Sequence, residues 1–212
     1  VVYKVTGYSN ATTMIVQPIS YSSNSLLSAQ TNTTDSAIKT KLDNWYQSNL
    51  INYTSYLADT TFCNDRSITT GSGYLISSGT NYGAYNRLYK NKTPSLKCSQ
   101  ENDRFKVSNS SAKLNYPVGL ILADEVALAG GRASLTNTNH YLYNGKNFWT
   151  FSPSYFASYD SRSYVCTVMG SDSLNLWRSI GTLYGVRPVI NLKQSITISK
   201  GDGTPLNPFS IG

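Results

Sequence analysis

The sequence predicts an α+β chain, in which two helices lie among short strands and long irregular segments. One helical pattern covers residues 36–50 and a shorter one covers residues 123–129. Strand-like apolar patterns are clearest at residues 148–153 and 185–192. Between the helices lies an excursion, residues 53–113, which is too long for a structureless loop in a compact domain. We therefore expect this excursion to contain short strands or turns and to be held in place.

The first helix is predicted to begin at Asp35 or Ser36, because either side chain can cap the N–H groups of a first turn. Apolar residues then recur at helical spacing and form one stripe, as in a helix packed on a core. The stripe consists of Ile38, Leu42, Trp45, Tyr46 and Leu50. The residues expected to face away from the core are Lys39, Lys41 and Asp43.

The second helix follows an apolar alternation, Val118–Leu122, that predicts a strand. Asp124 and Glu125 lie at the positive end of the helix dipole, where acidic side chains are favourable. Gly130 and Gly131 are expected to end the helix. Because the helix dipole alone accounts for the two adjacent acids, we favour this structural explanation over general acid/base chemistry.

Further strands are predicted elsewhere in the chain. Residues 1–5 and 12–18 have the pattern of two strands around a turn. Residues 164–169 have the pattern of a short strand. Pro188 lacks an N–H group, so it places its strand at a sheet edge or at a bulge. The segment 201–209 is rich in turn residues.

Three cysteines occur without a Cys-x-x-Cys pair, so zinc and redox motifs are not indicated. Cys63 and Cys98 both lie in long polar parts of the excursion, and a disulfide between them would hold that segment in place. Such a bond fits an oxidising compartment. Cys166 is then left over, either as a buried strand residue or as a free thiol.

The composition is typical of secreted β-rich proteins. Charged residues make up 14% of the chain, against a typical value of about 25%. The net charge of +7 comes from scattered Lys and Arg, which does not support a nucleic-acid groove. No apolar run is long enough for a membrane span, and no signal peptide is recognisable. The chain begins directly in a strand pattern, so we expect a mature or trimmed fragment.

The sequence offers little support for catalysis. His140 is the only histidine, lies in a polar turn and is expected at the surface. A single histidine removes most support for histidine metal sites and for Ser-His-Asp triads. No nucleophile, base and orienting group can be assembled from the remaining residues. We therefore expect a non-enzymatic chain without catalytic residues, metal ligands or a cofactor.

Residues 154–184 differ from the strand patterns that flank them, because they are rich in Ser, Tyr, Asp and Gly with added Trp and Arg. Tyr and Trp supply large contact area at low entropic cost, while Ser, Gly and Asn supply adaptable hydrogen bonds. The stretch is either a ligand-binding surface or an ordinary polar loop region. The candidate ligand-binding residues are Tyr155, Tyr159, Asp160, Arg162, Tyr164, Asp172, Asn175, Trp177 and Arg178.

A subset of these candidates is expected to lie on one exposed, partly concave surface and to carry most of the binding energy. The subset is Tyr155, Tyr159, Arg162, Trp177 and Arg178. Arg187 is expected to have a structural role instead. It lies in an apolar strand, where a guanidinium group needs carbonyl or carboxylate partners.

Three segments together resemble a known group of domains: residues 122–126 (LADEV), 148–153 (FWTFSP) and 185–192 (GVRPVINL). The chain resembles surface-protein domains of Firmicutes and related gut bacteria, which are similar to the C-type lectin-like fold in the branch shared with formylglycine-generating enzymes. The resemblance covers most of the chain and is clearest from Tyr116 onwards. It implies one domain, residues 1–212, with two helices around a small, twisted antiparallel sheet and an irregular ligand face.

Several members of this fold are variable proteins of diversity-generating retroelements, which rewrite adenine-encoded positions near the C-terminus. The resemblance implies that residues 154–184 are such a variable ligand-binding region. The sequence lacks the redox cysteine pair of the formylglycine-generating enzymes and the Glu-Pro-Asn, Gln-Pro-Asp and Trp-Asn-Asp motifs of calcium-dependent lectins. A structural cation would have to use Asp160, Asp172 or backbone oxygens.

The resemblance therefore implies a receptor or adhesin at the cell surface or outside the cell, which binds a protein or glycan ligand through residues 154–184. Neither nucleic acid nor direct membrane insertion by this fragment is expected. A pilin-like structural subunit of a surface fibre is the alternative. An enzyme of the formylglycine-generating type has the weakest support.

Overall fold

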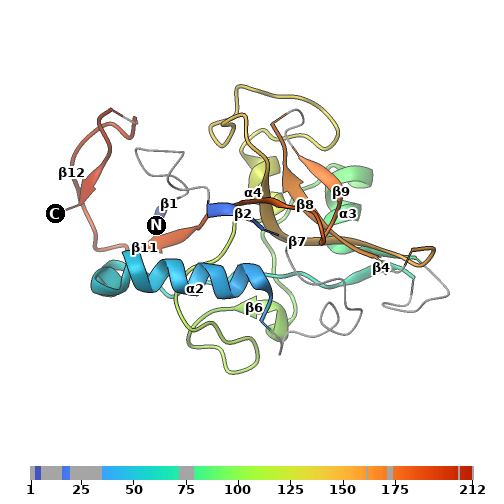
Figure 1. Ribbon diagram of the computed structural model, residues 1–212, viewed down its shortest axis with the longest axis horizontal. Coiled ribbons are helices and arrows are strands. Elements are labelled where there is room, and N and C mark those ends of the chain that lie inside the picture. The colour runs from blue at the N-terminus through green and yellow to red at the C-terminus, as the bar shows by residue number, and fades with distance from the viewer. Residues whose placement is uncertain are drawn as a thin grey trace.

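The computed structural model describes residues 3–5, 16–19, 35–71, 79–160, 162–170, 174–204 and 206–211, and for the first two ranges the backbone alone. The fold is α+β, with a few helices and mainly antiparallel sheets (Figure 1). The helical elements are α2 (Ala37–Asn49), η1 (Ile51–Tyr56), α3 (Gly83–Tyr85), η2 (Asn86–Asn91), η3 (Glu101–Asp103) and α4 (Ala123–Leu128). The strands are β1 (Tyr3–Val5), β2 (Val16–Ile19), β3 (Phe62–Cys63), β4 (Ile68–Thr70), β5 (Thr80–Tyr82), β6 (Arg104–Phe105), β7 (Phe148–Ala157), β8 (Arg162–Val168), β9 (Asn175–Ser179), β10 (Tyr184–Val186), β11 (Ile190–Leu192), β12 (Ile198–Lys200) and β13 (Ser210–Ile211).

The central sheet of seven strands is built around β7. β8 pairs antiparallel with one edge of β7, and β9 continues the sheet beyond β8. The other edge of β7 is shared by β10, which pairs in parallel at Phe148, and by β5, which pairs antiparallel near Phe156. β2 and β4 then extend the sheet beyond β10 and β5. The predicted strands at residues 148–153 and 164–169 are therefore confirmed, and both are longer than expected.

Each face of β7 packs on its own hydrophobic core. Trp149 faces the core that contains the buried stripe of α2. Phe148 faces the core that contains Val126 of α4 and Leu88 of η2. Burying one such side chain fully contributes about 1.5–3 kcal/mol. Helices thus cover both faces of the sheet, with α2 on one face and α4 and α3–η2 on the other (Figure 1).

Helix α2 confirms the predicted capping and the predicted apolar stripe. The Oγ atom of Ser36 accepts a hydrogen bond from the backbone N–H of Lys39 at 3.1 Å. The prediction that Asp43 faces away was wrong, because Asp43 is buried. Its carboxylate forms an ion pair with Lys39 and accepts a hydrogen bond from the Nδ2 atom of Asn115 at 2.8 Å. The carboxylate therefore connects the helix to the segment before α4.

Helix α4 is also confirmed, but the strand predicted before it is reduced to one bridge. The Glu125 carboxylate accepts a hydrogen bond from the Leu122 N–H at 2.9 Å, and Gly130 ends the helix with a φ of 101°. In the preceding segment only Gly119 forms a bridge, with Val189. In a strand with one solvent-exposed face, buried and exposed side chains alternate. Residues 118–122 do not follow this pattern, because the adjacent side chains of Leu120 and Ile121 are both buried.

The segment predicted as one strand at residues 185–192, with Pro188 at an edge or a bulge, forms two strands in different sheets. β10 pairs within the central sheet, whereas β11 pairs antiparallel with β1 in a separate sheet. Pro188 lies between the two strands, where its missing N–H does not disrupt a ladder. β12 and β13 then form a small antiparallel pair at one end of the molecule (Figure 1).

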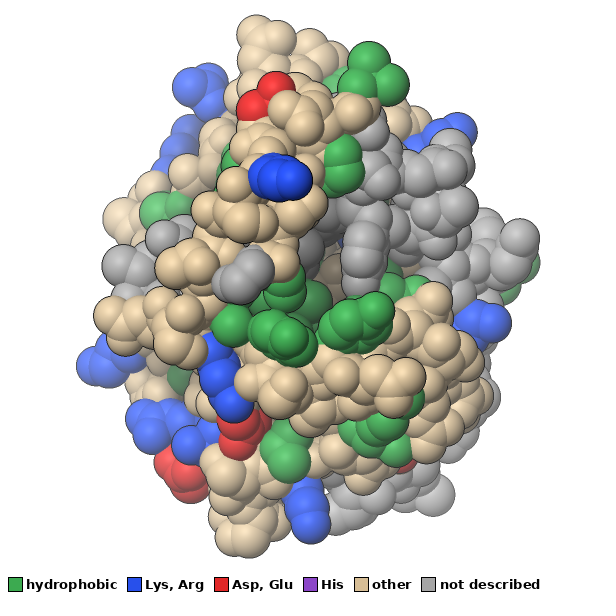
Figure 2. Space-filling view, turned by 90° about the vertical axis from the view of Figure 1, so that its left-hand side faces the viewer, with side chains coloured by type: hydrophobic (Ala, Val, Ile, Leu, Met, Phe, Trp, Pro, Cys, Tyr) green, Lys and Arg blue, Asp and Glu red, His purple; other side chains and the backbone are tan. Residues whose placement is uncertain are grey.

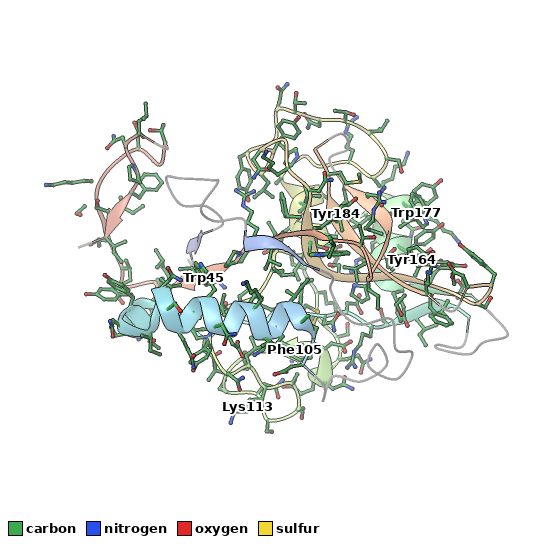
Figure 3. The ribbon with its side chains drawn as sticks, in the orientation of Figure 1. Trp45, Phe105, Lys113, Tyr164, Trp177 and Tyr184 are labelled. Atoms are coloured by element: carbon green, nitrogen blue, oxygen red, sulfur yellow. A yellow bond between two sulfur atoms is a disulfide. The ribbon has the colours of Figure 1, made fainter. Side chains whose placement is uncertain are left out.

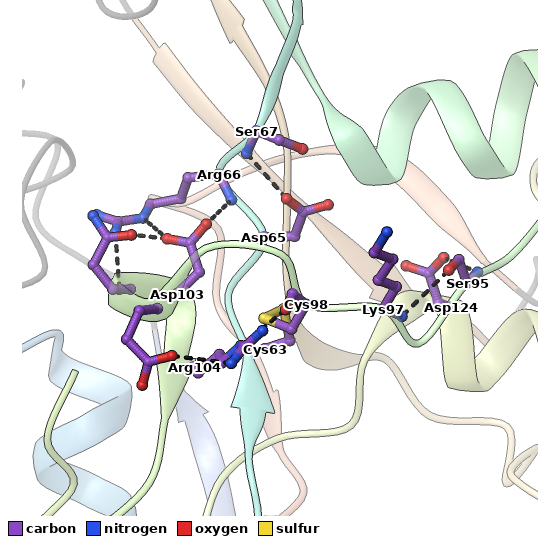
Figure 4. The surroundings of a disulfide bond; sticks show 12 residues. Cys63, Asp65, Arg66, Ser67, Ser95, Lys97, Cys98, Asp103, Arg104 and Asp124 are labelled. Atoms are coloured by element: carbon purple, nitrogen blue, oxygen red, sulfur yellow. Dashed lines mark hydrogen bonds and ion pairs between the residues drawn. A yellow bond between two sulfur atoms is a disulfide. The ribbon is translucent and has the colours of Figure 1, made fainter. Parts of the chain in front are cut away.

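The excursion between α2 and α4 is held in place at several points, as predicted. Cys63 and Cys98 form a disulfide with a Cα–Cα distance of 5.8 Å. Asp103 accepts hydrogen bonds from the backbone N–H and the Nε–H of Arg66, at 3.0 and 2.6 Å (Figure 4). Because these contacts link residues about half the excursion apart, they replace the regular hydrogen bonding that the segment lacks.

Candidate ligand-binding face

Residues 154–184 form the end of β7, the strands β8 and β9, and the start of β10. Several positions in the middle of this stretch lie in the core, namely Cys166, Val168, Leu174 and Leu176. These positions of the stretch are therefore not available to a ligand. Strand geometry explains the outcome, because successive side chains point to opposite faces and only part of them reach solvent.

Trp177 on β9 packs against two tyrosines that come from the excursion. Its ring lies 5.9 Å from the Tyr85 ring and 5.0 Å from the Tyr89 ring, with interplanar angles of 74° and 80°. The Tyr85 and Tyr89 rings lie 5.5 Å apart. These two residues are four positions apart on the continuous α3–η2 helix, so they share one helix face. Edge-to-face packing of this kind fixes the orientation of the rings.

A second pair of tyrosines lies on β7 and β8. Tyr155 and Tyr164 are directly opposite in the strand register, and their rings lie 5.8 Å apart. The Tyr164 hydroxyl donates a hydrogen bond to the Asp160 carboxylate at 3.2 Å. Burial, contact with Tyr159 and the negative charge of Asp160 raise the pKa of Tyr164. The phenol therefore stays protonated and remains a hydrogen-bond donor at neutral pH.

These two groups of rings belong to one area. Asn81 of β5 pairs with Tyr155 of β7, and α3 with Tyr85 follows β5 directly, which connects the helix side to the strand side. Figure 3 shows Trp177 and Tyr164 at the same end of the molecule, beside α3. We define the aromatic face as Tyr85, Tyr89, Tyr155, Tyr159, Tyr164 and Trp177. The most accessible members are Tyr159 and Tyr89, with exposed fractions of 80% and 44%.

Arg178 does not belong to this face, which corrects the prediction that it shares an exposed surface with Trp177. Its guanidinium lies 5.3 Å above the ring of Tyr184, which belongs to the core on the α2 side. The Nη2 atom also contacts the sulfur of Met169 at 3.4 Å. Trp177 and Arg178 are neighbours on one strand, so their side chains point to opposite faces of the sheet.

The remaining polar candidates interact mainly with residues close to them in the chain. The Asn175 side chain accepts a hydrogen bond from the backbone N–H of Trp177 at 3.0 Å, so it positions the strand that carries the indole. Arg162 is exposed, and its Nε lies 3.6 Å from the Asp160 carboxylate. Asp172 lies outside the described residues. Within the described part of the chain, no three His, Cys, Asp or Glu side chains are placed to hold a metal ion.

Sequence reasoning missed Tyr85 and Tyr89, although a signal was present. The segment GAYNRLYK, residues 83–90, carries the two tyrosines and Leu88 at helical spacing. It was obscured because it lies inside a Gly-, Ser- and Tyr-rich part of the excursion. Residues 86–91 are wound as a π-helix, a rare geometry that is often found at functional sites.

Arg187 lies between β10 and β11 and not in a strand, but it has a carbonyl partner of the predicted kind. Its Nη1 atom donates a hydrogen bond to the Leu142 carbonyl at 2.9 Å, and its guanidinium lies 5.2 Å from the Phe148 ring. Burial lowers the pKa of Arg187. Through these two contacts Arg187 holds the segment around Leu142 against β7.

His140 was predicted at the surface, and this prediction was wrong. The side chain is buried, with its ring 6.1 Å from that of Tyr143. Burial lowers the pKa of His140, and the charge of Arg187 lowers it further. Neither ring nitrogen has a hydrogen-bond partner among the described residues. His140 is therefore a neutral, buried residue in the segment between α4 and β7.

Cys166 satisfies both of the alternatives that the sequence left open, because it is a buried strand residue and a free thiol. Burial and the nearby Asp124 carboxylate raise its pKa. A thiol with a raised pKa is a poor nucleophile, because the thiolate is the reactive form.

Comparison with known proteins gives no relative for this chain: no protein-family model, curated protein or solved structure matches it. Within the described residues, no helix has the length and the apolar character that a bilayer crossing requires.

Proposed function

We propose that this chain is a non-enzymatic ligand-binding module of a bacterial cell-surface protein, a receptor or adhesin with a C-type lectin-like fold. Its aromatic face binds a protein or glycan ligand. The observation that carries the proposal is the aromatic face itself, in which six rings from α3, η2, β7, β8, β9 and the β7–β8 turn lie together.

Two further features support this role. Large aromatic side chains are the residue type that is enriched at binding hot spots, and Tyr159 is almost fully solvent-exposed. The disulfide is compatible with an oxidising environment outside the cell. The helices on both faces of the central sheet and the long excursion closed by the disulfide support the proposed fold.

The proposal also implies that some positions within residues 154–184 vary in amino acid between isolates, while others stay constant. Diversification by a retroelement would act on exposed positions such as Tyr159 and Arg162. The core positions Cys166 and Leu176 would stay constant, because substitutions there disturb the packing of α4 and η2.

The test compares two double variants on the same probes, an array of immobilised glycans and intact bacterial and epithelial cells. Tyr89→Ala/Tyr159→Ala removes the two most exposed rings of the aromatic face. Tyr53→Ala/Tyr56→Ala removes two exposed rings of η1 and serves as the matched control. We expect the first variant to lose at least about tenfold in affinity, as at a hot spot, while the control keeps its affinity.

Both variants should unfold at nearly the wild-type temperature, because exposed substitutions usually change stability by less than about 0.5 kcal/mol. Unchanged binding by Tyr89→Ala/Tyr159→Ala, at retained fold, contradicts the proposed site.

A structural subunit of a surface fibre is the second candidate, and one observation favours it. Hydrophobic side chains gather on the end face that carries the β12–β13 pair (Figure 2). The exposed apolar residues of η1 and of this tail are Ile51, Tyr53, Tyr56, Ile198, Leu206, Phe209 and Ile211. Monomeric proteins rarely expose large contiguous apolar areas. Light scattering over a range of concentrations tests this role: assembly that Ile51→Asp abolishes supports it, and a monomer at all concentrations contradicts it.

A further inference from the structure

The aromatic face is bordered by positive charge that has no counter-ion among the residues that the structure describes. Lys90 and Lys92 lie at the end of η2, are exposed and form no ion pair within the described residues. The Nζ atom of Lys90 lies 5.9 Å from the Tyr85 ring, so its charge is adjacent to the face. Lys92 ends η2 with a left-handed backbone, φ 55°, which turns the chain at this point.

The described carboxylates around the aromatic face are paired with arginines. Arg87 binds both Asp124 and Asp65. Asp160 interacts with Arg162 and with the Tyr164 hydroxyl. With Lys90 and Lys92 included, four positive side chains stand against three carboxylates among these described residues, so the balance beside the aromatic rings is positive. An anionic ligand complements it.

The size of the exposed aromatic surface limits the class of ligand. A stable protein interface buries about 800 Å² on each partner around a desolvated apolar core. Here only Tyr89 and Tyr159 are more than one third exposed among the rings of the aromatic face, and the other four are half-buried. Rigid rings of this limited extent fit the flat C–H surface of one or two sugar rings better than the core of a protein interface.

We propose, on the basis of the function proposed above, that the aromatic face binds an anionic glycan that carries carboxylate or sulfate groups. The sugar rings stack on Tyr89 and the neighbouring Trp177, and the acidic groups pair with the ammonium groups of Lys90 and Lys92. Binding of this kind weakens as salt is added, because the lysines are solvent-exposed.

The experiment uses the full chain with four immobilised probes: heparin, polygalacturonate, the neutral polysaccharide dextran, and poly-glutamate as an acidic polypeptide. Three variants are compared with the wild type. Lys90→Gln/Lys92→Gln removes the charge beside the face, Tyr89→Ala removes the stacking ring, and Lys193→Gln/Lys200→Gln removes two exposed charges elsewhere.

We expect heparin or polygalacturonate to bind and dextran and poly-glutamate to bind at least about tenfold more weakly. Lys90→Gln/Lys92→Gln should weaken binding about tenfold and flatten its salt dependence, whereas Tyr89→Ala should weaken it with the salt dependence retained. The Lys193→Gln/Lys200→Gln control should bind like the wild type.

Several outcomes overturn the inference. Equal binding of poly-glutamate assigns the site to an acidic protein segment, and equal loss in the control variant shows a diffuse charge effect. Binding of neutral glycans that depends on Tyr89 leaves the proposed binding function standing and removes only the anionic class. If glycans or cells bind with no dependence on Tyr89 or Tyr159, the proposed function itself fails.

Discussion

Arg87 binds Asp124 through two parallel hydrogen bonds, from Nε to Oδ1 at 2.8 Å and from Nη2 to Oδ2 at 2.9 Å. The Asp124 side chain is almost fully buried. The same carboxylate accepts a hydrogen bond from the Ser95 N–H at 2.8 Å, and Arg87 also pairs with Asp65. These two acids raise the pKa of Arg87, against the opposing effect of burial. One ion-pair network therefore joins α4, the π-wound helix that carries Tyr89, and the segment after it.

The first prediction follows from this network. Arg87→Ala should destabilise the fold by about 3 kcal/mol, because it leaves the buried Asp124 carboxylate without its cation. Arg104→Ala is the comparison variant, because its ion pair with Glu101 is partly exposed and contributes about 0–1 kcal/mol. Its Nε–H also donates to the Cys98 carbonyl at 2.9 Å, which adds about 0.5–1.5 kcal/mol, so we expect a smaller loss than for Arg87→Ala. Urea unfolding of both variants measures the difference. Equal stability of the two variants contradicts a structural role for the network.

The disulfide supports the same region from its other side. The double variant Cys63→Ala/Cys98→Ala should lose about 2–4 kcal/mol of stability, because the bond closes a loop across a sequence separation of 35 residues. The wild-type protein in a thiol reductant should show the same loss, measured by chemical unfolding. The double variant itself should be insensitive to the reductant. A reductant effect that persists in the variant would show that the loss does not come from this bond.

The sequence predicted regular elements well where one face of the element is exposed to solvent, as in α2 with its single apolar stripe. The prediction was poor where neighbouring apolar residues pack into two different cores, as at Val118–Leu122. Adjacent positions are then both apolar, so the alternation typical of a strand is lost. The prediction also failed for Asp43 and His140, whose burial depends on partners from distant segments. Four of the six residues of the aromatic face were sequence candidates, because they come from the compositionally distinct stretch, whereas Tyr85 and Tyr89 come from the excursion. Long-range packing between those two segments is not visible in local patterns.

A third prediction concerns pH. The folded-state pKa of His140 lies below the usual value of 6.5, because burial and the neighbouring charge of Arg187 disfavour its protonation. The unfolded chain therefore binds more protons than the folded chain when the pH falls below about 6.5. Stability should be complete above that pH and should decline below it, with a limiting slope of about 1.4 kcal/mol per pH unit from this group.

The variant His140→Phe isolates this contribution, since it keeps an aromatic ring against Tyr143 and removes the titrating group. Unfolding free energies between pH 5 and 7.5 should fall less steeply with acid in the variant than in the wild type. Parallel curves for the two proteins would show that His140 does not control the acid response.

A fourth prediction concerns Arg187. Arg187→Ala should destabilise the protein by about 1–3 kcal/mol, because it removes the donor to the Leu142 carbonyl and the contact with the Phe148 ring. Arg132→Ala, at an exposed arginine, should change the melting temperature little. Binding to any ligand of the aromatic face should be unaffected at temperatures where the variant is folded. Loss of binding without loss of stability would make Arg187 a ligand contact.

The last prediction separates diversified positions from scaffold positions within residues 154–184. Random substitution at Tyr159 and Arg162 should leave most variants folded, because both side chains are exposed. Random substitution at Cys166 and Leu176 should unfold most variants, because both side chains are fully buried. At Leu176 a smaller side chain removes about 2–5 kcal/mol. At Cys166 most replacements are larger or polar, and a larger one costs about 1–3 kcal/mol through overpacking. Protease resistance of displayed libraries measures the folded fraction at each position. Sequencing of the same locus in several isolates should then show variation at the first pair of positions and constancy at the second. Variation spread equally over both pairs would contradict a binding face carried on a fixed scaffold, because the core between α4 and η2 could not accommodate it.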